Sequence, residues 1–210
     1  MDIIYLEYTS ERREITLQQA ENLGDYIKRY IDQGNIIKEE IILRGDLFYK
    51  IFYKQPNQTH QDILNAELTP DTKKLVVREI ENFGDYMLEK DFFYDGQGQS
   101  IGSTNTLFDP NNILIATENI INGVTQYEYS SSKEYYDLDI YPDGPVFISE
   151  FDENGSFVEI YYPNEDIEPD GQESEVFSNS SADLARVMAR TGISQDLMDY
   201  YLIPDVTPTF

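Results

Sequence analysis

The chain has 210 residues, of which 40 are acidic and 15 basic, with one histidine and no cysteine. Without cysteine there is no disulfide, thiolate metal site or cysteine nucleophile. The net charge of −25 argues against direct binding to nucleic acid or to an anionic membrane, because both require a basic surface. The charge is also uneven: residues 91–176 contain 19 acids and one base.

The N-terminal segment Met1–Glu7 begins with an acid where a signal peptide carries basic residues, and its apolar run ends at Glu7. No segment of the chain approaches the ~18 uncharged residues of a membrane span. We therefore expect a cytoplasmic protein that does not enter a membrane.

Turn signals centred on glycine, asparagine and proline recur along the chain, mostly every 10 to 15 residues. Between them lie short runs rich in β-branched and aromatic residues, at Ile36–Leu43, Leu47–Tyr53, Phe92–Tyr94, Val124–Tyr129, Val146–Phe151 and Phe157–Tyr162. This pattern predicts a mainly β (α+β) fold in which an antiparallel meander of β-hairpins forms a large twisted sheet.

Residues 15–31 fit either a helix or a hairpin, because their apolar residues also follow a helical spacing. Residues 21–27 and 81–87 share five of seven residues, each with a central Gly-Asp. Gly-Asp is poor inside a helix and suits a turn, so we predict a hairpin for the second copy and leave the first open.

The C-terminal part changes character. Residues 164–181 are acidic and poor in apolar residues, which predicts a solvated linker. Ser181 is predicted to cap an amphipathic helix that Gly192 ends, and Ser194–Leu202 predicts a second short helix. We therefore expect a β-hairpin domain at 1–163, an acidic linker at 164–181 and a helical segment at 182–210 that packs on the sheet.

Three units share an aromatic residue, an Asp and a later Gly or Asn: Phe93–Gly98, Leu107–Asn112 and Glu150–Val158. They resemble the YD-type and MORN-like hairpin repeats of bacterial proteins found in toxin–immunity loci. The resemblance covers roughly residues 30–162. It implies a β-meander and a toxin–immunity context, and it supplies no catalytic residue.

No motif for catalysis or for a cofactor stands out. His60 lies in a polar stretch beside a turn and is interpreted as a surface residue, and one histidine cannot build a usual zinc site. Asp139 to Glu150 matches a calcium loop at four positions, but Tyr141 replaces an oxygen ligand, so a hairpin turn is the preferred interpretation. We expect no enzyme activity, no cofactor and no metal.

The acidic, tyrosine-rich strands are the candidate binding surface. A solvent-exposed sheet face on which tyrosines lie among carboxylates complements the charge of a partner rich in Lys and Arg. The predicted contact residues are Tyr129, Tyr136, Asp137, Asp139, Tyr141, Asp143, Glu150, Asp152, Glu153, Glu159 and Tyr161. The expected function is that of a cytoplasmic immunity protein that covers the active cleft of a basic toxin domain, plausible targets being a nuclease or a nucleobase-modifying enzyme. The alternatives are a hairpin scaffold that is acidic only for solubility, and a carbohydrate- or calcium-binding module.

Overall fold

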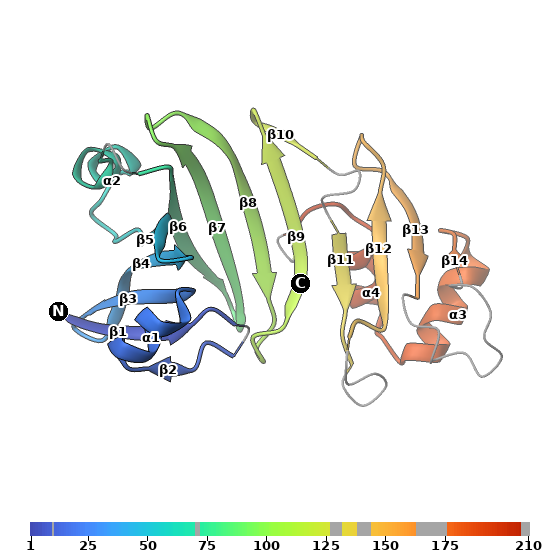
Figure 1. The fold of residues 1–210 in the computed structure, drawn as a ribbon. Helices are drawn as coiled ribbons and strands as arrows, with labels where there is room; N and C mark the ends of the chain where they lie inside the picture. The colour runs from blue at the N-terminus through green and yellow to red at the C-terminus, as the bar shows by residue number, and fades with distance from the viewer. Residues whose placement is uncertain (10, 70–71, 127–131, 138–143, 163–175, 207–210) are drawn as a thin grey trace. The chain divides into compact units, whose positions relative to one another are not determined.

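The computed structural model describes residues 1–9, 11–69, 72–126, 132–137, 144–162 and 176–206. Most of them form one hydrogen-bonded series of strands (Figure 1). The strands are β1 (Asp2–Glu7), β2 (Glu14–Ile15), β3 (Tyr26–Asp32), β4 (Asn35–Leu43), β5 (Asp46–Tyr53), β6 (Lys74–Phe83), β7 (Tyr86–Asp95), β8 (Ser100–Phe108), β9 (Leu114–Ile121), β10 (Val124–Thr125), β11 (Ser132–Tyr135), β12 (Phe147–Phe151), β13 (Phe157–Tyr161) and β14 (Val176–Phe177). The helices are α1 (Leu17–Leu23), α2 (His60–Glu67), α3 (Ser181–Thr191) and α4 (Gln195–Tyr201).

The strand order is β14-β13-β12-β11-β9-β8-β7-β6-β5-β4-β3-β1-β2, with β10 paired to β9. The mainly β, mostly antiparallel sheet with short C-terminal helices is confirmed. Two-residue turns join several hairpins, and in three of them a residue with positive φ precedes a glycine with positive φ, at Gln33-Gly34, Arg44-Gly45 and Asn122-Gly123. Such turns match the twist of the strands that they join.

The sequence interpretation missed helix α2. It joins β5 to β6, which run parallel with Ile51 opposite Val76, so this connection is a crossover and not a hairpin. Thr59 caps the helix, and Asp62 bonds back to the Thr59 backbone. This capping box was visible in the sequence.

The ambiguous segment 15–31 contains both predicted structures. Thr16 caps the short helix α1, Gly24 ends it in the left-handed conformation, and β3 follows. In the second copy Gly84 lies in the tight turn between β6 and β7, as predicted. The same Gly-Asp thus ends a helix once and turns a hairpin once, because both tasks need a residue that tolerates positive φ.

The chain divides into two compact units, residues 1–80 with 90–103 and residues 81–89 with 104–210. In the first unit, Leu6, Ile27, Ile41, Ile51 and Val76 form one buried cluster on one face of the sheet. On the other face, α2 packs Ile63 and Leu64 against Leu75 and Val77 of β6.

The second unit has the larger core. In Figure 1 helix α4 lies behind β11 and β12 and helix α3 lies beside β13 and β14, and both helices share a buried cluster with these strands. Val187, Met198 and Tyr201 of the helices are buried against Phe147 and Ile160 of the sheet. The two C-terminal helices therefore pack on the sheet of the second unit.

Details of the tail differ from the prediction. Ser180, and not Ser181, caps α3, while Gly192 ends it as expected. Val176 and Phe177 lie within the predicted linker, yet they form strand β14 beside β13. The rest of that linker, up to residue 175, is outside the described residues.

Three hairpin turns share one hydrogen-bond pattern. One carboxylate oxygen of Asp95, Asp109 and Asp152 accepts the backbone N–H groups two and four residues later, at 2.8–2.9 Å. The residue three positions on, Gly98, Asn112 or Gly155, has positive φ. These turns are the units that carry the resemblance to hairpin repeats, and their aspartates hold the chain reversals together.

Replacing Asp109 by Ala should lower the free energy of unfolding by about 1–2 kcal/mol, because two backbone N–H groups lose their acceptor. Asp109→Asn keeps the accepting oxygen and should cost less than half as much. Urea unfolding of both variants measures the difference. Equal losses would mean that the carboxylate does not act through these bonds.

Candidate functional site

Strands β11, β12 and β13 alternate between a covered face and an open face. Lys133, Ser149 and Ile160 are mutual cross-strand partners, and all three are buried on the helix side. Their chain neighbours therefore point to the other side of the sheet, since successive strand residues face opposite ways. That open face is not covered by α3 or α4.

We call this open surface the acidic face. By strand register it consists of Ser132, Glu134, Ile148, Glu150, Glu159, Tyr161 and Val176, and Tyr136, the residue after β11, joins it through its hydrogen bond to Glu134. Glu150 lies directly opposite Glu159, and Glu134 belongs to the neighbouring row with Ile148 and Tyr161. Three carboxylates and Tyr161 from three strands thus share one surface with Tyr136 at the end of β11.

The carboxylates of the acidic face repel one another. Partial burial, followed by the charge of Glu159, raises the pKa of Glu150 above its ordinary value. Burial and the charges of Glu150 and Glu134 raise the pKa of Tyr161. Among the described residues, neither Glu150 nor Glu159 has a cationic partner. Like charges directly opposite in a sheet destabilise it, so this pair is an unfavourable feature of the isolated protein.

The two tyrosines are anchored differently. The Tyr136 hydroxyl donates to Glu134 at 2.6 Å while its ring packs partly against the core. Tyr161 is half-buried and has Ile148 as its cross-strand partner. The hydrogen bond holds the Tyr136 hydroxyl beside Glu134, which limits the entropy that a partner's binding would cost at this residue.

The structure brings together part of the predicted contact set. Tyr136, Glu150, Glu159 and Tyr161 lie on the acidic face, and the neighbouring Asp137 is half-buried. Four predicted residues lie outside the described residues: Tyr129, Asp139, Tyr141 and Asp143.

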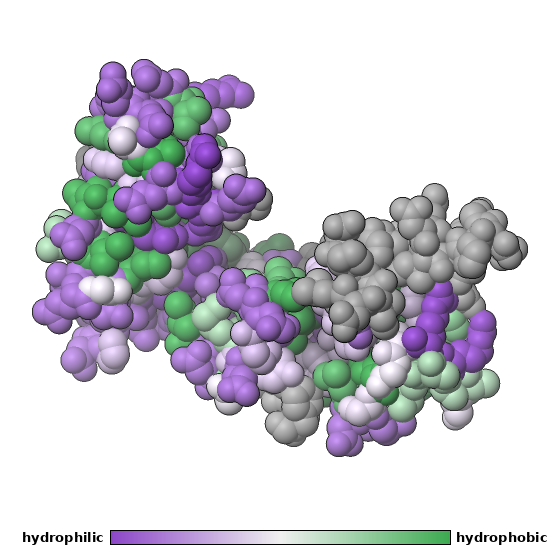
Figure 2. Space-filling model, turned by 90° about the horizontal axis from the view of Figure 1, so that it is seen from below, coloured by the Kyte–Doolittle hydropathy of each residue, from purple (hydrophilic) through white to green (hydrophobic). Residues whose placement is uncertain are grey.

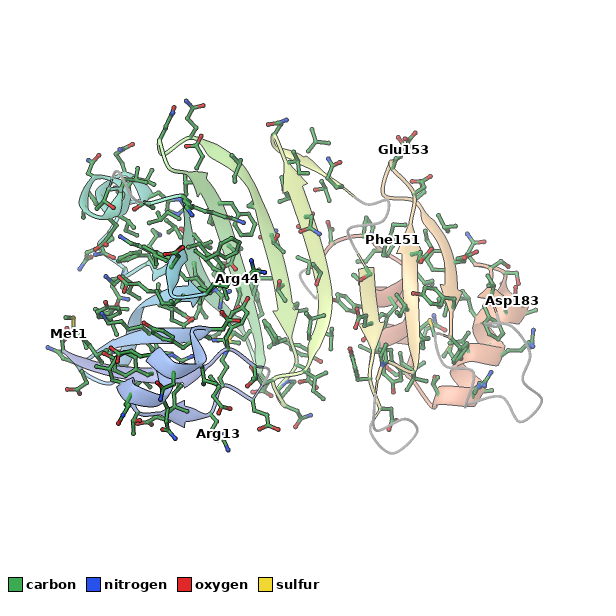
Figure 3. All side chains as sticks on the ribbon, viewed as in Figure 1. Met1, Arg13, Arg44, Phe151, Glu153 and Asp183 are labelled. Carbon is green, nitrogen blue, oxygen red and sulfur yellow. The ribbon has the colours of Figure 1, made fainter. Side chains whose placement is uncertain are left out.

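Two of the predicted contact residues, Asp152 and Glu153, lie in the turn between β12 and β13 and have different roles. The Asp152 carboxylate accepts bonds within its own turn, so it shapes the hairpin. Glu153 is exposed at the tip of that turn and points away from the strands in Figure 3. The prediction omitted Glu134, although it follows the same two-residue alternation as Tyr136.

The single base of the acidic segment is not on the acidic face. Lys133 is 1% exposed beneath α4, where its Nζ donates to the Tyr200 carbonyl oxygen at 2.5 Å. The same Nζ lies 3.5 Å from the centroid of the Tyr200 ring. Burial lowers the pKa of Lys133 to about 7, and the charge of Asp205 opposes this shift in part. Lys133 therefore fastens the C-terminal helix to the sheet and does not neutralise the acidic face.

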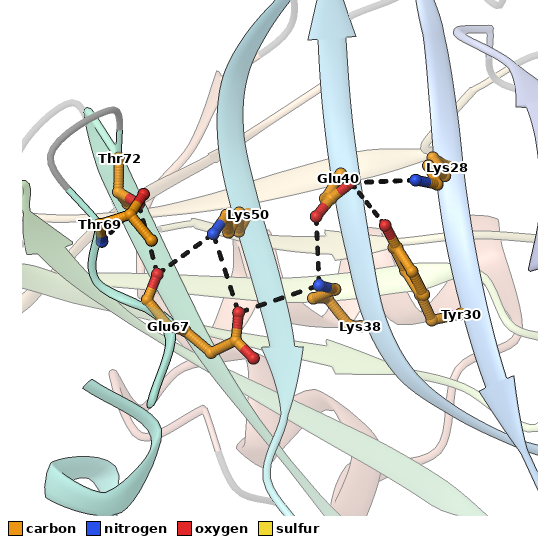
Figure 4. A network of polar contacts seen from close by, with 8 residues as sticks. All are labelled: Lys28, Tyr30, Lys38, Glu40, Lys50, Glu67, Thr69 and Thr72. Atoms are coloured by element: carbon orange, nitrogen blue, oxygen red, sulfur yellow. Dashed lines mark hydrogen bonds and ion pairs between the residues drawn. The ribbon is translucent and has the colours of Figure 1, made fainter. Parts of the chain in front are cut away.

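In the first unit, several lysine and glutamate side chains form ion pairs with one another. Figure 4 shows Glu40 between Lys28 and Lys38, with Lys38 and Lys50 also beside Glu67. Lys50 is buried and donates to the Glu67 carbonyl oxygen as well. Paired charges of this kind leave little net field, in contrast to the acidic face.

His60 is not the free surface residue that the sequence suggested. Its Nδ1 lies 2.6 Å from the Tyr94 hydroxyl and its Nε2 lies 2.9 Å from the Glu79 carboxylate, which also pairs with Lys54. The imidazole packs edge-on against Phe92, with ring centroids 4.6 Å apart. His60 thus ties the start of α2 to β6 and β7.

Replacing His60 by Ala should lower the free energy of unfolding by about 1–2 kcal/mol, because Tyr94 and Glu79 each lose a hydrogen-bond partner. Gln61→Ala, at the next and exposed position of α2, is the control and should change stability by less than about 0.5 kcal/mol. Urea unfolding compares the two. A histidine variant as stable as the control would contradict a structural role for this network.

Apolar side chains on the surface seen in Figure 2 lie in separate patches among hydrophilic residues. The described residues contain no group of three or more His, Cys, Asp or Glu side chains placed to hold a metal ion. Within the same part of the chain, no helix combines the length and the apolar character needed to cross a membrane. Comparisons with models of protein families, with curated proteins and with solved structures give no match to this chain.

Proposed function

We propose that the chain is an immunity-type binding protein that neutralises a basic toxin domain, and that its acidic face forms the contact. It performs no chemistry itself. The observation that carries the proposal is the Glu150–Glu159 pair, which lies on the sheet face that α3 and α4 leave open and which has no cationic partner among the described residues. A partner's Lys or Arg side chains would supply the missing positive charge.

The surroundings of this pair favour a protein partner over a small cation. Tyr136 and Tyr161 add amphipathic contact area beside the carboxylates, and tyrosine is enriched where binding energy concentrates. The fixed sheet also pre-organises the charges, which reduces the cost of ordering them upon binding.

The toxin partner would be an enzyme that itself binds an anionic substrate. A cleft that holds nucleic acid is lined by Lys and Arg, so an acidic, flat and aromatic surface can occupy it by imitating phosphates and bases. The weak resemblance of the Asp turns to hairpin repeats of toxin–immunity loci agrees with this reading. We expect inhibition by steric cover, with association that slows as salt rises.

Capture from a lysate of the source organism tests the proposal when three proteins are compared. These are the native chain, a variant with Glu134, Glu150 and Glu159 changed to Gln, and a control with Glu11, Glu14 and Glu21 changed to Gln. The three control acids are exposed in the first unit. The proposal expects one basic protein that the native chain and the control both capture and the first variant loses.

The captured protein must also be inhibited. Its expression should stop growth, and co-expression of the native chain should restore it, while the variant on the acidic face should not. A scaffold that is acidic only for solubility would instead behave alike in all three forms, and that result would reject the proposal.

A further inference from the structure

The first unit contains three connected titratable side chains that the proposed function does not use. His60 is the first residue of α2, Glu79 lies in β6 and Tyr94 lies in β7. The Tyr94 hydroxyl lies 2.6 Å from His60 Nδ1, and His60 Nε2 lies 2.9 Å from a carboxylate oxygen of Glu79. We call this set the Tyr-His-Glu triad. A hydroxyl, an imidazole and a carboxylate in this order match the arrangement in which a base activates a nucleophile and a third group orients the base.

The direction of each hydrogen bond in the triad follows from the carboxylate. Burial opposes the charge of Glu79, but hydrogen bonds from Lys54 and His60 outweigh it and lower the pKa of this carboxyl group. An ionised carboxylate only accepts, so the Nε2 atom that faces it carries the hydrogen of a neutral imidazole. The Nδ1 atom then has an unshared lone pair, and the Tyr94 hydroxyl donates to it. His60 is therefore placed to take the tyrosine proton.

The surrounding structure holds the triad in place. Thr59 caps α2 and Asp62 bonds back to the Thr59 backbone, so the helix has a fixed start at His60. The Phe92 ring packs edge-on against the imidazole, with ring centroids 4.6 Å apart. Phe92 and Tyr94 both pack against the buried cluster beneath α2. A base that is fixed by packing and by hydrogen bonds stays within reach of its nucleophile.

The triad is accessible to a small reagent and serves one tyrosine. The side chains of His60 and Glu79 are 22% and 24% exposed, and Tyr94 is half-buried. Burial and the charge of Glu79 raise the pKa of Tyr94, so the phenol keeps its proton at neutral pH until a base removes it. His60 is the single histidine of the chain, and both of its ring nitrogens are engaged. Tyr94 is therefore the tyrosine that an imidazole serves.

We propose that Tyr94 is a reactive tyrosine that accepts an acyl group from an activated carboxylic ester, with His60 as its general base and Glu79 as a positioning residue. The Tyr94 oxygen forms a bond to the carbonyl carbon of the ester, and the bond from that carbon to the leaving oxygen breaks. The hydroxyl proton passes to His60 Nδ1 and from there to the leaving oxygen. Glu79 stabilises the imidazolium that forms between these two proton transfers.

The net charge of the protein favours an uncharged acyl donor over a phosphoryl donor. A phosphoryl donor carries several negative charges, and a protein with a net charge of −25 repels it. A neutral ester meets no such barrier. The class of modification is therefore acylation of the tyrosine oxygen.

Site-resolved mass spectrometry of the full chain after brief exposure to p-nitrophenyl acetate tests the proposal. Tyr8 is the internal control, because it is 45% exposed and does not bond to the histidine. A general base accelerates proton transfer by about 100-fold or more, so Tyr94 should acetylate at least about tenfold faster than Tyr8 despite its lower exposure. In His60→Gln, whose amide offers the same hydrogen bonds but is not a base, Tyr94 should react no faster than Tyr8. Gln61→Ala, at the next and exposed position, should behave as the native chain does.

The pH dependence separates a general base from a residue that only ties α2 to the sheet. In the native chain the acetylation rate of Tyr94 should reach a plateau as the pH rises, since the imidazole is then fully neutral. In His60→Gln the rate should keep rising, since it then depends on the phenolate, and the raised pKa of Tyr94 moves phenolate formation to higher pH.

Glu79→Gln tests the positioning residue. The amide keeps an oxygen that accepts from Nε2, but the imidazolium loses its counter-charge, so acetylation of Tyr94 should slow by about tenfold. A native Tyr94 that reacts no faster than Tyr8, or that reacts equally in the native chain and in His60→Gln, would overturn the proposal.

The outcome is independent of the proposed function, because the triad lies in the first unit and the acidic face in the second. Tyr94→Phe removes the nucleophile and should leave capture of the basic partner intact. Preferential acetylation of Tyr94 without any capture would reject the proposed function alone. Capture without preferential acetylation would reject the triad alone.

Discussion

Changing Glu150 and Glu159 together to Gln is expected to make the protein more stable and a weaker binder. The two side chains are direct cross-strand partners, and relief of their repulsion should raise the free energy of unfolding by about 0.2–1 kcal/mol at pH 7. The affinity for the basic partner should fall about 100-fold, or about 2.7 kcal/mol, because two carboxylates no longer meet the partner's cations. Urea unfolding and calorimetry measure the two effects.

The double variant is expected to gain stability and to lose affinity, and these opposite changes distinguish a binding surface from one that serves only the fold. A surface selected only for fold stability would not retain like charges opposite each other, whereas a binding surface can. Lowering the pH should also weaken binding before it unfolds the protein, since the raised pKa of Glu150 makes it take up a proton before an ordinary glutamate. If the double variant binds as tightly as the native chain, the acidic face is not the contact.

The stability of the native protein is expected to rise between pH 7 and pH 10 because of Lys133. The folded-state pKa is about 7, below the value of 10.5 in the unfolded chain. Between these values the unfolded chain binds the proton and the folded protein does not, so a higher pH favours folding by at most about 1.4 kcal/mol per pH unit. Below pH 7 both states bind the proton and this contribution is constant.

Lys133→Met removes the titrating group and fills most of its space. The stability of the native chain relative to this variant should improve by about 2–3 kcal/mol between pH 6.5 and pH 9.5. Tyr200 and Tyr201 do not interfere, because burial raises their pKa values above 10. Lys73→Met, at an exposed position, is the control whose curve should run parallel to that of the native chain. If the stability of Lys133→Met changed with pH in the same way as that of the native chain, Lys133 would not be a buried, neutral lysine.

The hairpins could be predicted because the residues within each turn determine its conformation. Gly34, Gly123 and Gly155 occupy the positive-φ positions of their turns, and a glycine or an asparagine is needed there whatever surrounds it. Helix α2 was missed because the proline-containing signals at residues 56 and 70 suggested two successive turns. The segment between them is short, and tertiary packing of Ile63 against β6 stabilises it more than its own propensity.

The candidate site was predicted only in part because it depends on strand register. Alternation along one strand places Glu134 and Tyr136 on one side, but it does not tell which residue of the next strand stands opposite. The bulge between Glu150 and Phe151 shifts the register of β12 against β13, and the sequence does not mark it. The burial of Lys133 was equally hidden, since its partner Tyr200 is 67 residues away.

The most direct test of the acidic face is a hydrogen-exchange footprint of the complex with the captured basic protein. We predict slower exchange on complex formation at β11, β12 and β13, with unchanged exchange in the hairpins β3 to β5 of the first unit. Protection confined to β3 to β5, with β11 to β13 exchanging as in the free protein, would contradict the account.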